Sequence, residues 1–516
     1  MQQSQSKQQV GGILGFIERI GNKIPDITIL FISAFLLVCV VSAVLAQIHF
    51  NYVHPATGRP IEITNMLSGK ALVDLMSKMV TNYANFPPLS MVIVATLGIG
   101  IADGSGYINT GLKKILSITP KVLITPVVIL VGMLSHLGPD SGYVIIIPIA
   151  AYMFYAVGKH PLAGIAASFA GIAGAFAANY TPSAIDPVIQ GFTQSAAQII
   201  DPGYQVNVLC NYFYAFASTF IVIGACWWVT EKITNPWLWR ACPLDDDLDL
   251  GNENNSSITP SENRAFKIAT AVLLLMLTGL AAALYPADSI LRAPDGVIAS
   301  FKAPIMQSIV SLIFIFAALV GLVYGIACGK FKSPKDVTAA MEEITKTLVQ
   351  LIVFYFFAAQ FLYAFGASNM GALIAVSGAE FLKSLNLPPQ VTVFGIIVFV
   401  ALLNLIITSA SAKWAILAPI FVPMLMAVGI APELTQVAFR VSDSAVNVVT
   451  PMFAFYPLII LYCQKYVKNA GIGTLSSMML PYTIALLVSL TFMLYLFWWL
   501  DIPLGFQADY VYPRRF

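Results

Sequence analysis

Long apolar runs recur along the whole chain and are separated by short polar segments. A helix of about 20 apolar residues crosses the hydrocarbon core of a bilayer, which is about 30 Å thick. By this criterion we predict nine transmembrane helices, at residues 27–47, 122–157, 161–185, 207–230, 266–285, 304–329, 388–428, 432–462 and 474–500. The first run is longer than the apolar core of a signal peptide, about 7–15 residues, so we interpret it as an uncleaved helix. The pattern predicts an all-α polytopic membrane protein.

Two further stretches, residues 70–103 and 347–384, each consist of two short apolar pieces around a polar kink. The kinks lie at Asn85–Pro88 and at Gly366–Asn369. Pieces this short favour re-entrant hairpins buried in protein, because unpaired backbone polar groups are costly in lipid.

The runs at 122–157 and 388–428 are longer than one crossing requires, and both contain proline and polar residues near their middle. We therefore predict that both are crossing helices with a break. A break frees backbone N–H and C=O groups, which can bind ions or polar groups where they line a cavity.

The chain contains an internal repeat. With an offset of 271 residues, residues 140–161 align with 411–432 without a gap and share eight identities in 22 positions. We predict two halves, residues 1–239 and 304–516, joined by a polar linker and one connecting span at 240–303. Five crossings separate the first spans of the halves, so the halves are expected to be inverted. Inverted repeats with interrupted helices in matching positions are typical of secondary transporters, which bind their substrate where the breaks meet.

Composition supports the membrane class. Hydrophobic residues make up 58% of the 516 residues and charged residues only 10%, whereas soluble proteins carry about 25% charged residues. The net charge of +2 gives no basic surface for a nucleic acid. The sequence has no GxxxxGK[ST], HExxH or GxSxG motif, so we expect no enzyme and no ATP site, and the driving force must come from an ion or substrate gradient.

Basic residues predict the orientation in the membrane. Cytoplasmic loops carry an excess of Lys and Arg. With nine crossings, the groups beside the first, sixth and eighth spans all face the cytoplasm, which places the N-terminus inside; these groups are Lys7, Arg19 and Lys23, then Lys330, Lys332 and Lys335, then Lys465 and Lys468. One group, Lys113, Lys114 and Lys121, would lie outside, against the rule.

Three ionisable residues in apolar surroundings are candidates for function, because each costs about 2.5–3.5 kcal/mol or more within a membrane. Asp186 follows a polar break and could carry a proton or bind an ion. Arg440 and Asp443 are three residues apart, on one face of a helix. They could form a structural salt bridge, or Arg440 could bind a substrate carboxylate while Asp443 holds it or titrates.

Hydroxyl, basic and aromatic residues cluster at the break of the run at 388–428. Ser411 could help to bind a carboxylate, or a Na⁺ ion together with Asp186, and no other cofactor is expected. Trp414 and its counterpart in the first half, Tyr143, could stack on an aromatic ligand. Lys413 could belong to this site or could extend its ammonium group to the membrane interface.

Several segments resemble the p-aminobenzoyl-glutamate transporter (AbgT) family over essentially the whole chain. The block from Ser409 to Met424 is the most specific of them, and the others are Ile17–Pro25, Val157–Gly164 and Gly473–Tyr482. The resemblance implies a dimeric protein of the bacterial inner membrane, with nine helices and two re-entrant hairpins per protomer. It also implies that the site residues are Asp186, Asn369, Ser411, Trp414, Pro432, Arg440 and Asp443.

Three departures from the family pattern fall at the expected site: Gly138-Pro139, Gly366-Ala367 and Lys413. They leave the identity of the substrate open. We expect a secondary active transporter for a small aromatic carboxylate such as p-aminobenzoyl-glutamate, or an exporter of sulfonamide-type antimetabolites, driven by an H⁺ or Na⁺ gradient. The alternative is an uncoupled channel or facilitator, which would use the same broken helices.

Overall fold

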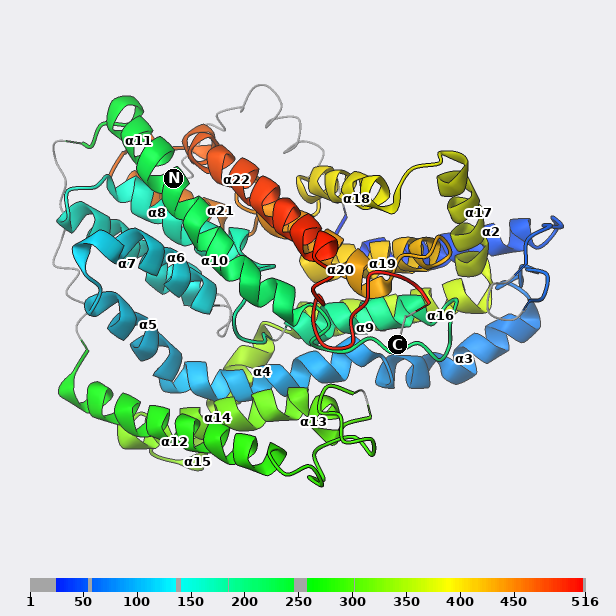
Figure 1. The fold of residues 1–516 in the computed structure, drawn as a ribbon, viewed down its shortest axis with the longest axis horizontal. Coiled ribbons are helices and arrows are strands. Elements are labelled where there is room, and N and C mark those ends of the chain that lie inside the picture. The colour runs from blue at the N-terminus through cyan, green and yellow to red at the C-terminus, as the bar shows by residue number, and fades with distance from the viewer. Residues whose placement is uncertain are drawn as a thin grey trace, which may run out of the picture.

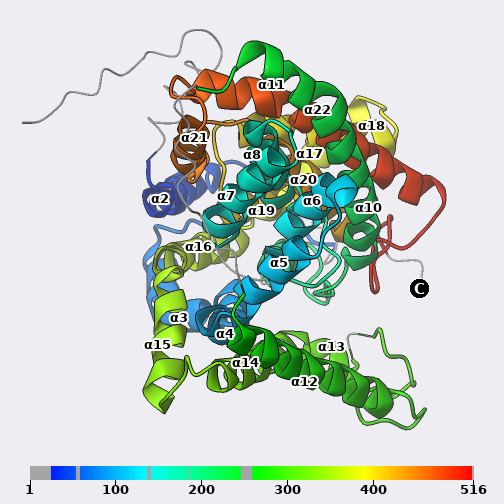
Figure 2. The same cartoon turned by 90° about the vertical axis from the view of Figure 1, so that its left-hand side faces the viewer.

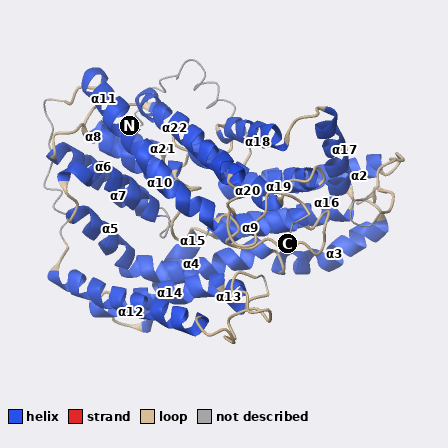
Figure 3. Cartoon of the chain, in the orientation of Figure 1, coloured by secondary structure: helices blue, strands red, loops and turns tan. Residues whose placement is uncertain are grey.

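The computed structural model describes residues 25–53, 58–135, 141–183, 185–245, 258–300 and 302–513. Within these ranges the protein is helical, with two isolated β-bridges and no strand (Figure 3). Seven helices are long and apolar enough to cross a membrane, or eight if one bent pair counts as a single span. The prediction of an all-α polytopic membrane protein is therefore confirmed, whereas the count of nine spans stays a prediction.

The helices follow the order of the two predicted halves (Figure 1). The first half contains α2 (Ile27–Leu45), α3 (Gly69–Ala84), α4 (Pro87–Ser105), α5 (Tyr107–Ser117), η1 (Lys121–Leu123), α6 (Ile124–Leu134), α7 (Ser141–Ala156), α8 (Pro161–Phe169), η3 (Ala170–Gly174), α9 (Ile185–Ala197), α10 (Tyr212–Val229), η4 (Thr230–Thr234) and α11 (Asn235–Ala241). The connecting helix is α12 (Pro260–Leu284). The second half contains α13 (Pro304–Gln307), α14 (Ile309–Ala327), α15 (Pro334–Lys346), α16 (Val349–Ala367), α17 (Met370–Ser384), α18 (Pro389–Asn404), α19 (Ala410–Met426), α20 (Pro432–Val446), α21 (Tyr456–Gln464) and α22 (Ile472–Trp499).

The segment at 122–157 turns back instead of crossing once, which corrects our prediction. Lys121 at its start and Lys159 just after its end line the same pocket. The Lys159 ammonium also donates a hydrogen bond to the Thr125 hydroxyl, 3.0 Å away. The 11 residues of α6 span only about 16 Å at about 1.5 Å per residue, which is half the thickness of the bilayer core. We name α6 and α7 the first hairpin.

The segment at 388–428 turns back in the same way. Pro389 and Thr392 at its start line one pocket with Val428 and Ile430 after its end. We name α18 and α19 the second hairpin. Its turn, residues 405–409, is the break that the sequence predicted within this run.

The stretches predicted as hairpins behave differently. α3 and α4 follow one another as a single segment of 37 residues, Gly69–Ser105, and lie end to end in Figure 1. Prolines at the first turn of α4 interrupt the hydrogen-bond ladder without reversing the chain. α16 has the length of a span by itself, and the sharp bend, 117°, comes later, between α17 and α18. These revisions of spans and hairpins leave the number of crossings between the two halves unchanged. The boundaries of the halves and their inverted relation stay predictions.

The first long helix of each half packs against a helix of the other half. α2 packs against α16 of the second half, and α14 packs against α4 of the first. The last long helices of the two halves, α10 and α22, pack against each other (Figures 1 and 2). This reciprocal packing is what a two-fold relation between the halves requires.

The first hairpin lies directly on the helix α8 and its π-helical extension η3, through glycines. A Cβ atom on Gly164 would lie 2.4 Å from the Ala150 carbonyl oxygen, and one on Gly171 would lie 2.5 Å from the Ile129 carbonyl oxygen. Only glycine permits such an approach of two backbones. The small residues of this helix therefore serve close packing.

Candidate functional site

The candidate site lies where two irregular segments meet a buried helix. The irregular segments are residues 175–183, before α9, and the turn of the second hairpin; the helix is α20, whose 15 residues are all buried. Asp186 stands in the first turn of α9, where the helix dipole favours a negative charge. Its Oδ2 atom accepts hydrogen bonds from the backbone N–H and the hydroxyl of Ser183, at 2.8 and 3.0 Å. The carboxylate is thereby held at the break.

Two buried ion pairs join α20 to its neighbours. The guanidinium of Arg440 lies 2.8 Å from Asp186, with side chains 6% and 13% exposed. The ammonium of Lys413 lies 2.6 Å from Asp443, with side chains 0% and 1% exposed. The salt bridge between Arg440 and Asp443, one of the two alternatives from the sequence, is not formed, because each residue pairs with an opposite charge on another helix, α9 or α19.

Lys413 belongs to the interior and does not reach the membrane interface. Its ammonium group contacts the side-chain oxygen of Asn404 as well as Asp443. The Asn404 amide in turn donates to the backbone oxygen of Asp443, at 2.7 Å, and to Asn447 Oδ1, at 3.1 Å. This network fixes the turn of the second hairpin to α20.

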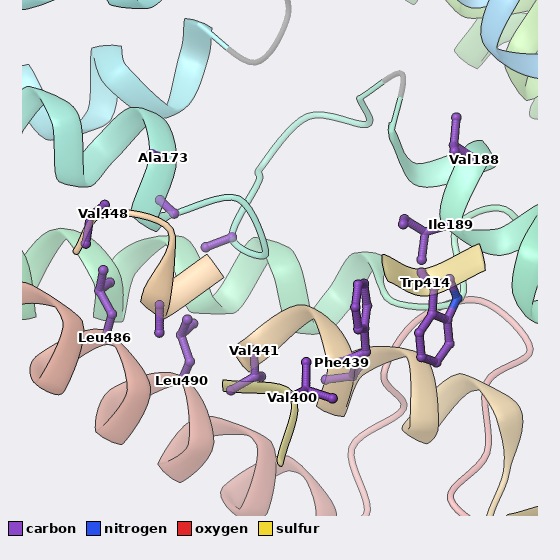
Figure 4. Packing of buried hydrophobic residues seen from close by; sticks show 14 of the residues in the cluster. Ala173, Val188, Ile189, Val400, Trp414, Phe439, Val441, Val448, Leu486 and Leu490 are labelled. Atoms are coloured by element: carbon purple, nitrogen blue, oxygen red, sulfur yellow. The ribbon is translucent and has the colours of Figure 1, made fainter. Parts of the chain in front are cut away.

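Trp414 is fully buried, and one face of its ring is covered. The ring stacks on Phe439 with centroids 4.4 Å apart (Figure 4). Its indole N–H donates to the Thr193 hydroxyl, at 2.8 Å. Tyr143 likewise stacks on Phe455, at 4.2 Å. In this conformation both rings pack against the protein, so stacking on a ligand would require the hairpins to move.

A hydrogen-bond chain that the sequence reasoning missed continues from Trp414. Thr193 donates to Gln436, at 2.6 Å, and the Gln436 amide donates to Asn211, at 2.7 Å. Asn211 donates to the backbone oxygen of Glu433, whose carboxylate accepts from Tyr204. The sequence does contain a signal for this chain, a polar stripe on α20 whose members recur at intervals of three or four: Glu433, Gln436, Arg440 and Asp443.

A small cavity adjoins the ion pair between Arg440 and Asp186. It has an empty volume of about 240 Å³ and is lined by Asp186 and Arg440 with residues before α9 and around the start of α10, namely Asn179, Thr181, Val208, Leu209, Asn211, Tyr212 and Ala215. Among the described residues, the buried Nη2 atom of Arg440 has no hydrogen-bond partner, and the same holds for Asp443 Oδ2. Sites for drug-sized ligands start at about 300 Å³, so this conformation does not accommodate a whole aromatic conjugate.

The remaining predicted residues lie apart from these pairs. Ser411 is buried in the first turn of α19, and Pro432 begins α20. Asn369 precedes α17 with a left-handed backbone and donates to the Glu62 carbonyl oxygen, at 2.9 Å, so it holds a loop. The described residues contain no group of three or more His, Cys, Asp or Glu that could hold a metal. Gly138-Pro139 lies outside the described residues.

Buried ion pairs at helix breaks, within a helical membrane protein that has two hairpins, define the class of secondary transporters. Comparison with known proteins supports this class. The AbgT putative transporter family matches residues 12–512, so the chain belongs to this family. It is 32% identical to the p-aminobenzoyl-glutamate transport protein of Escherichia coli K12 over 511 residues, 99% of this chain and 98% of that protein.

Two solved structures share the fold at full length. The YdaH transporter of Alcanivorax borkumensis superposes with a TM-score of 0.87 at 37% identity, covering 93% of this chain and 100% of that one. MtrF of Neisseria gonorrhoeae, one of a class of antimetabolite efflux pumps, gives 0.90 at 39% identity, covering 96% and 100%. The chain is therefore a multi-pass membrane transporter and not an enzyme.

Proposed function

We propose that this protein moves a small aromatic carboxylate across the bacterial inner membrane, coupled to a gradient of H⁺ or Na⁺. The substrate would be of the p-aminobenzoyl-glutamate type, or a sulfonamide-type antimetabolite that the protein exports. We also propose that the N-terminus is cytoplasmic and that the protein works as a homodimer.

The observation that carries the proposal is the state of Arg440. Its guanidinium lies beside a cavity, uses one nitrogen on Asp186 and has another, Nη2, with no hydrogen-bond partner in the described part of the chain. A guanidinium presents paired donors that match both oxygens of a carboxylate. A substrate carboxylate can therefore bind Arg440 and compete with Asp186 for it.

The need for charge balance would couple binding of the substrate to binding of a cation. The Arg440–Asp186 pair is neutral, and a substrate carboxylate adds one negative charge to a site that is almost fully buried. An uncompensated buried charge costs several kcal/mol, about 3–5 by analogy with broken buried pairs. A proton on Asp186, or a Na⁺ ion beside it, restores neutrality, so substrate and cation occupy the site together.

The closed cavity supports a cycle in which the second hairpin moves. Trp414 and Lys413 both stand at the start of α19, directly after the turn of this hairpin. Displacing the turn would uncover the Trp414 ring beside Arg440's helix. Trp414 would then contact the aromatic ring of the substrate while Arg440 holds its carboxylate.

The test is uptake of p-aminobenzoyl-glutamate, and separately of a sulfonamide, into proteoliposomes under separately imposed H⁺ and Na⁺ gradients. We expect accumulation above the external concentration with one of the two gradients and none without a gradient. Equilibration alone, with no accumulation under either gradient, would instead identify a facilitator.

A further inference from the structure

A second, larger pocket lies at the base of the first hairpin, where its two ends meet the end of α10. Its volume is about 1170 Å³, counting space open to the surroundings. It is lined by three lysines, one glutamate, two tryptophans and three small or apolar residues: Lys121, Lys159, Lys232, Glu231, Trp227, Trp228, Val122, Val157 and Gly224. It is separate from the cavity at Arg440, since the two share no lining residue.

The pocket carries an excess of positive charge. Glu231 forms an ion pair with Lys159, and the Thr125 hydroxyl donates to the same carboxylate at 2.6 Å. The other two lysines, Lys121 and Lys232, are exposed and belong to none of the five ion pairs found among the described residues. Two ammonium groups thus remain available for an anion at the mouth of this pocket.

An apolar stripe leads along α10 into the pocket. Phe216, Phe220, Gly224 and Trp228 follow one another at intervals of four residues, and Lys232 continues the series. The three aromatic side chains are 44%, 64% and 58% exposed. A Cβ atom added to Gly224 would meet no atom within 4 Å, so the stripe has an open notch between Phe220 and Trp228.

We infer that this pocket binds an anionic phospholipid of the surrounding membrane. The phosphate would lie between Lys121 and Lys232, and one acyl chain would follow the α10 stripe through the notch at Gly224. Tryptophans concentrate at the membrane interface, where lipid headgroups lie, and basic pockets between transmembrane helices bind such headgroups. The apolar stripe favours a lipid over free phosphate, because only a lipid has a chain to cover it.

Native mass spectrometry of the full-length protein in detergent tests this inference, with dioleoyl phosphatidylglycerol and dioleoyl phosphatidylcholine as probes. Each lysine near a phosphate contributes about fivefold in affinity. We expect the wild type to bind phosphatidylglycerol more tightly than phosphatidylcholine. The double variant Lys121→Gln/Lys232→Gln should bind phosphatidylglycerol about 25-fold more weakly.

Two further variants separate charge from shape. Lys332→Gln/Lys335→Gln removes the same charge from exposed positions outside the pocket and should leave binding unchanged. Gly224→Leu fills the notch without altering charge and should weaken binding of both lipids. The inference fails if the pocket double variant binds phosphatidylglycerol like the wild type. It also fails if Gly224→Leu changes the oligomeric state but not lipid binding, since the stripe would then be a contact between two copies.

Discussion

Lys413 and Arg440 are two buried cations that face carboxylates on different helices, and this arrangement determines what each can do. Lys413 is enclosed completely and is held by Asn404 as well as Asp443. Arg440 lies beside a cavity, and one of its nitrogens has no partner among the residues that the structure describes. The first pair therefore stabilises the turn of the second hairpin, whereas the second pair is accessible to a ligand.

Removing the Lys413 ammonium should destabilise the protein strongly. Lys413→Met leaves Asp443 as an uncompensated buried charge, and the free energy of unfolding should fall by about 3–5 kcal/mol. The double variant Lys413→Met/Asp443→Leu removes both charges and should recover most of the loss. Denaturant unfolding in detergent measures both values; a double variant as unstable as the single one would contradict this explanation.

Replacing Arg440 should weaken substrate binding selectively. Hydrogen bonds to a charged group contribute about 1.5–3 kcal/mol, so Arg440→Ala should weaken binding of p-aminobenzoyl-glutamate roughly 10- to 150-fold. For an analogue whose carboxylates are converted to amides, the same substitution should reduce the affinity much less. Equilibrium binding measures both ligands, and equal losses for the two would indicate a purely structural salt bridge.

The sequence was sufficient to select Asp186, Arg440 and Asp443, because an ionisable residue in an apolar run is rare and costly. It was not sufficient to pair them. Spacing on one helix reveals neighbours along that helix, whereas Arg440 and Asp443 found partners on other helices, α9 and α19. Lys413 stayed ambiguous for the same reason, since its environment depends on where the second hairpin turns.

At the scale of elements, each half of the chain contributes one hairpin. The second hairpin supplies Asn404, Lys413 and Trp414, and the first packs its backbone directly onto α8 and η3. Apolar length identified these segments but could not indicate whether the chain crosses or turns back. That depends on contacts between the two ends of a segment, such as Lys159 with Thr125.

Because the first hairpin turns back within the membrane, we predict that its two ends are accessible from the same side of the membrane. In a cysteine-free background, Lys121→Cys and Lys159→Cys should both react with a membrane-impermeant maleimide from the cytoplasmic face only. This placement would also bring Lys113, Lys114 and Lys121 into agreement with the positive-inside rule. Labelling of the two positions from opposite faces would mean that residues 122–157 cross the membrane once.

The close contact between Gly171 and the first hairpin predicts that a larger residue at this position destabilises the protein. Gly171→Ala places a methyl group 2.5 Å from the Ile129 carbonyl oxygen, and overpacking of this kind costs about 1–3 kcal/mol. Gly279→Ala in α12 is the matched control, since nothing lies within 4 Å of its added atom. Thermal unfolding in detergent should show a lower midpoint for the first variant and an equal or higher one for the second.

At the scale of the whole molecule, the reciprocal packing of the two halves places a neutral, buried Arg440–Asp186 pair beside a cavity that is too small for the full substrate. The central claim is that a substrate carboxylate takes Arg440 from Asp186, which then binds the coupling cation. Composition and family resemblance indicated a transporter, but this division of roles between Arg440 and Asp186 required the contacts.

The most direct test compares two kinds of transport in the same proteoliposomes carrying Asp186→Asn. Counterflow needs only substrate binding and conformational exchange, whereas accumulation also needs a cation that moves with the substrate. We predict that the D186N variant retains counterflow of p-aminobenzoyl-glutamate but loses gradient-driven accumulation. Accumulation equal to that of the wild type would contradict the claim that Asp186 binds the coupling cation.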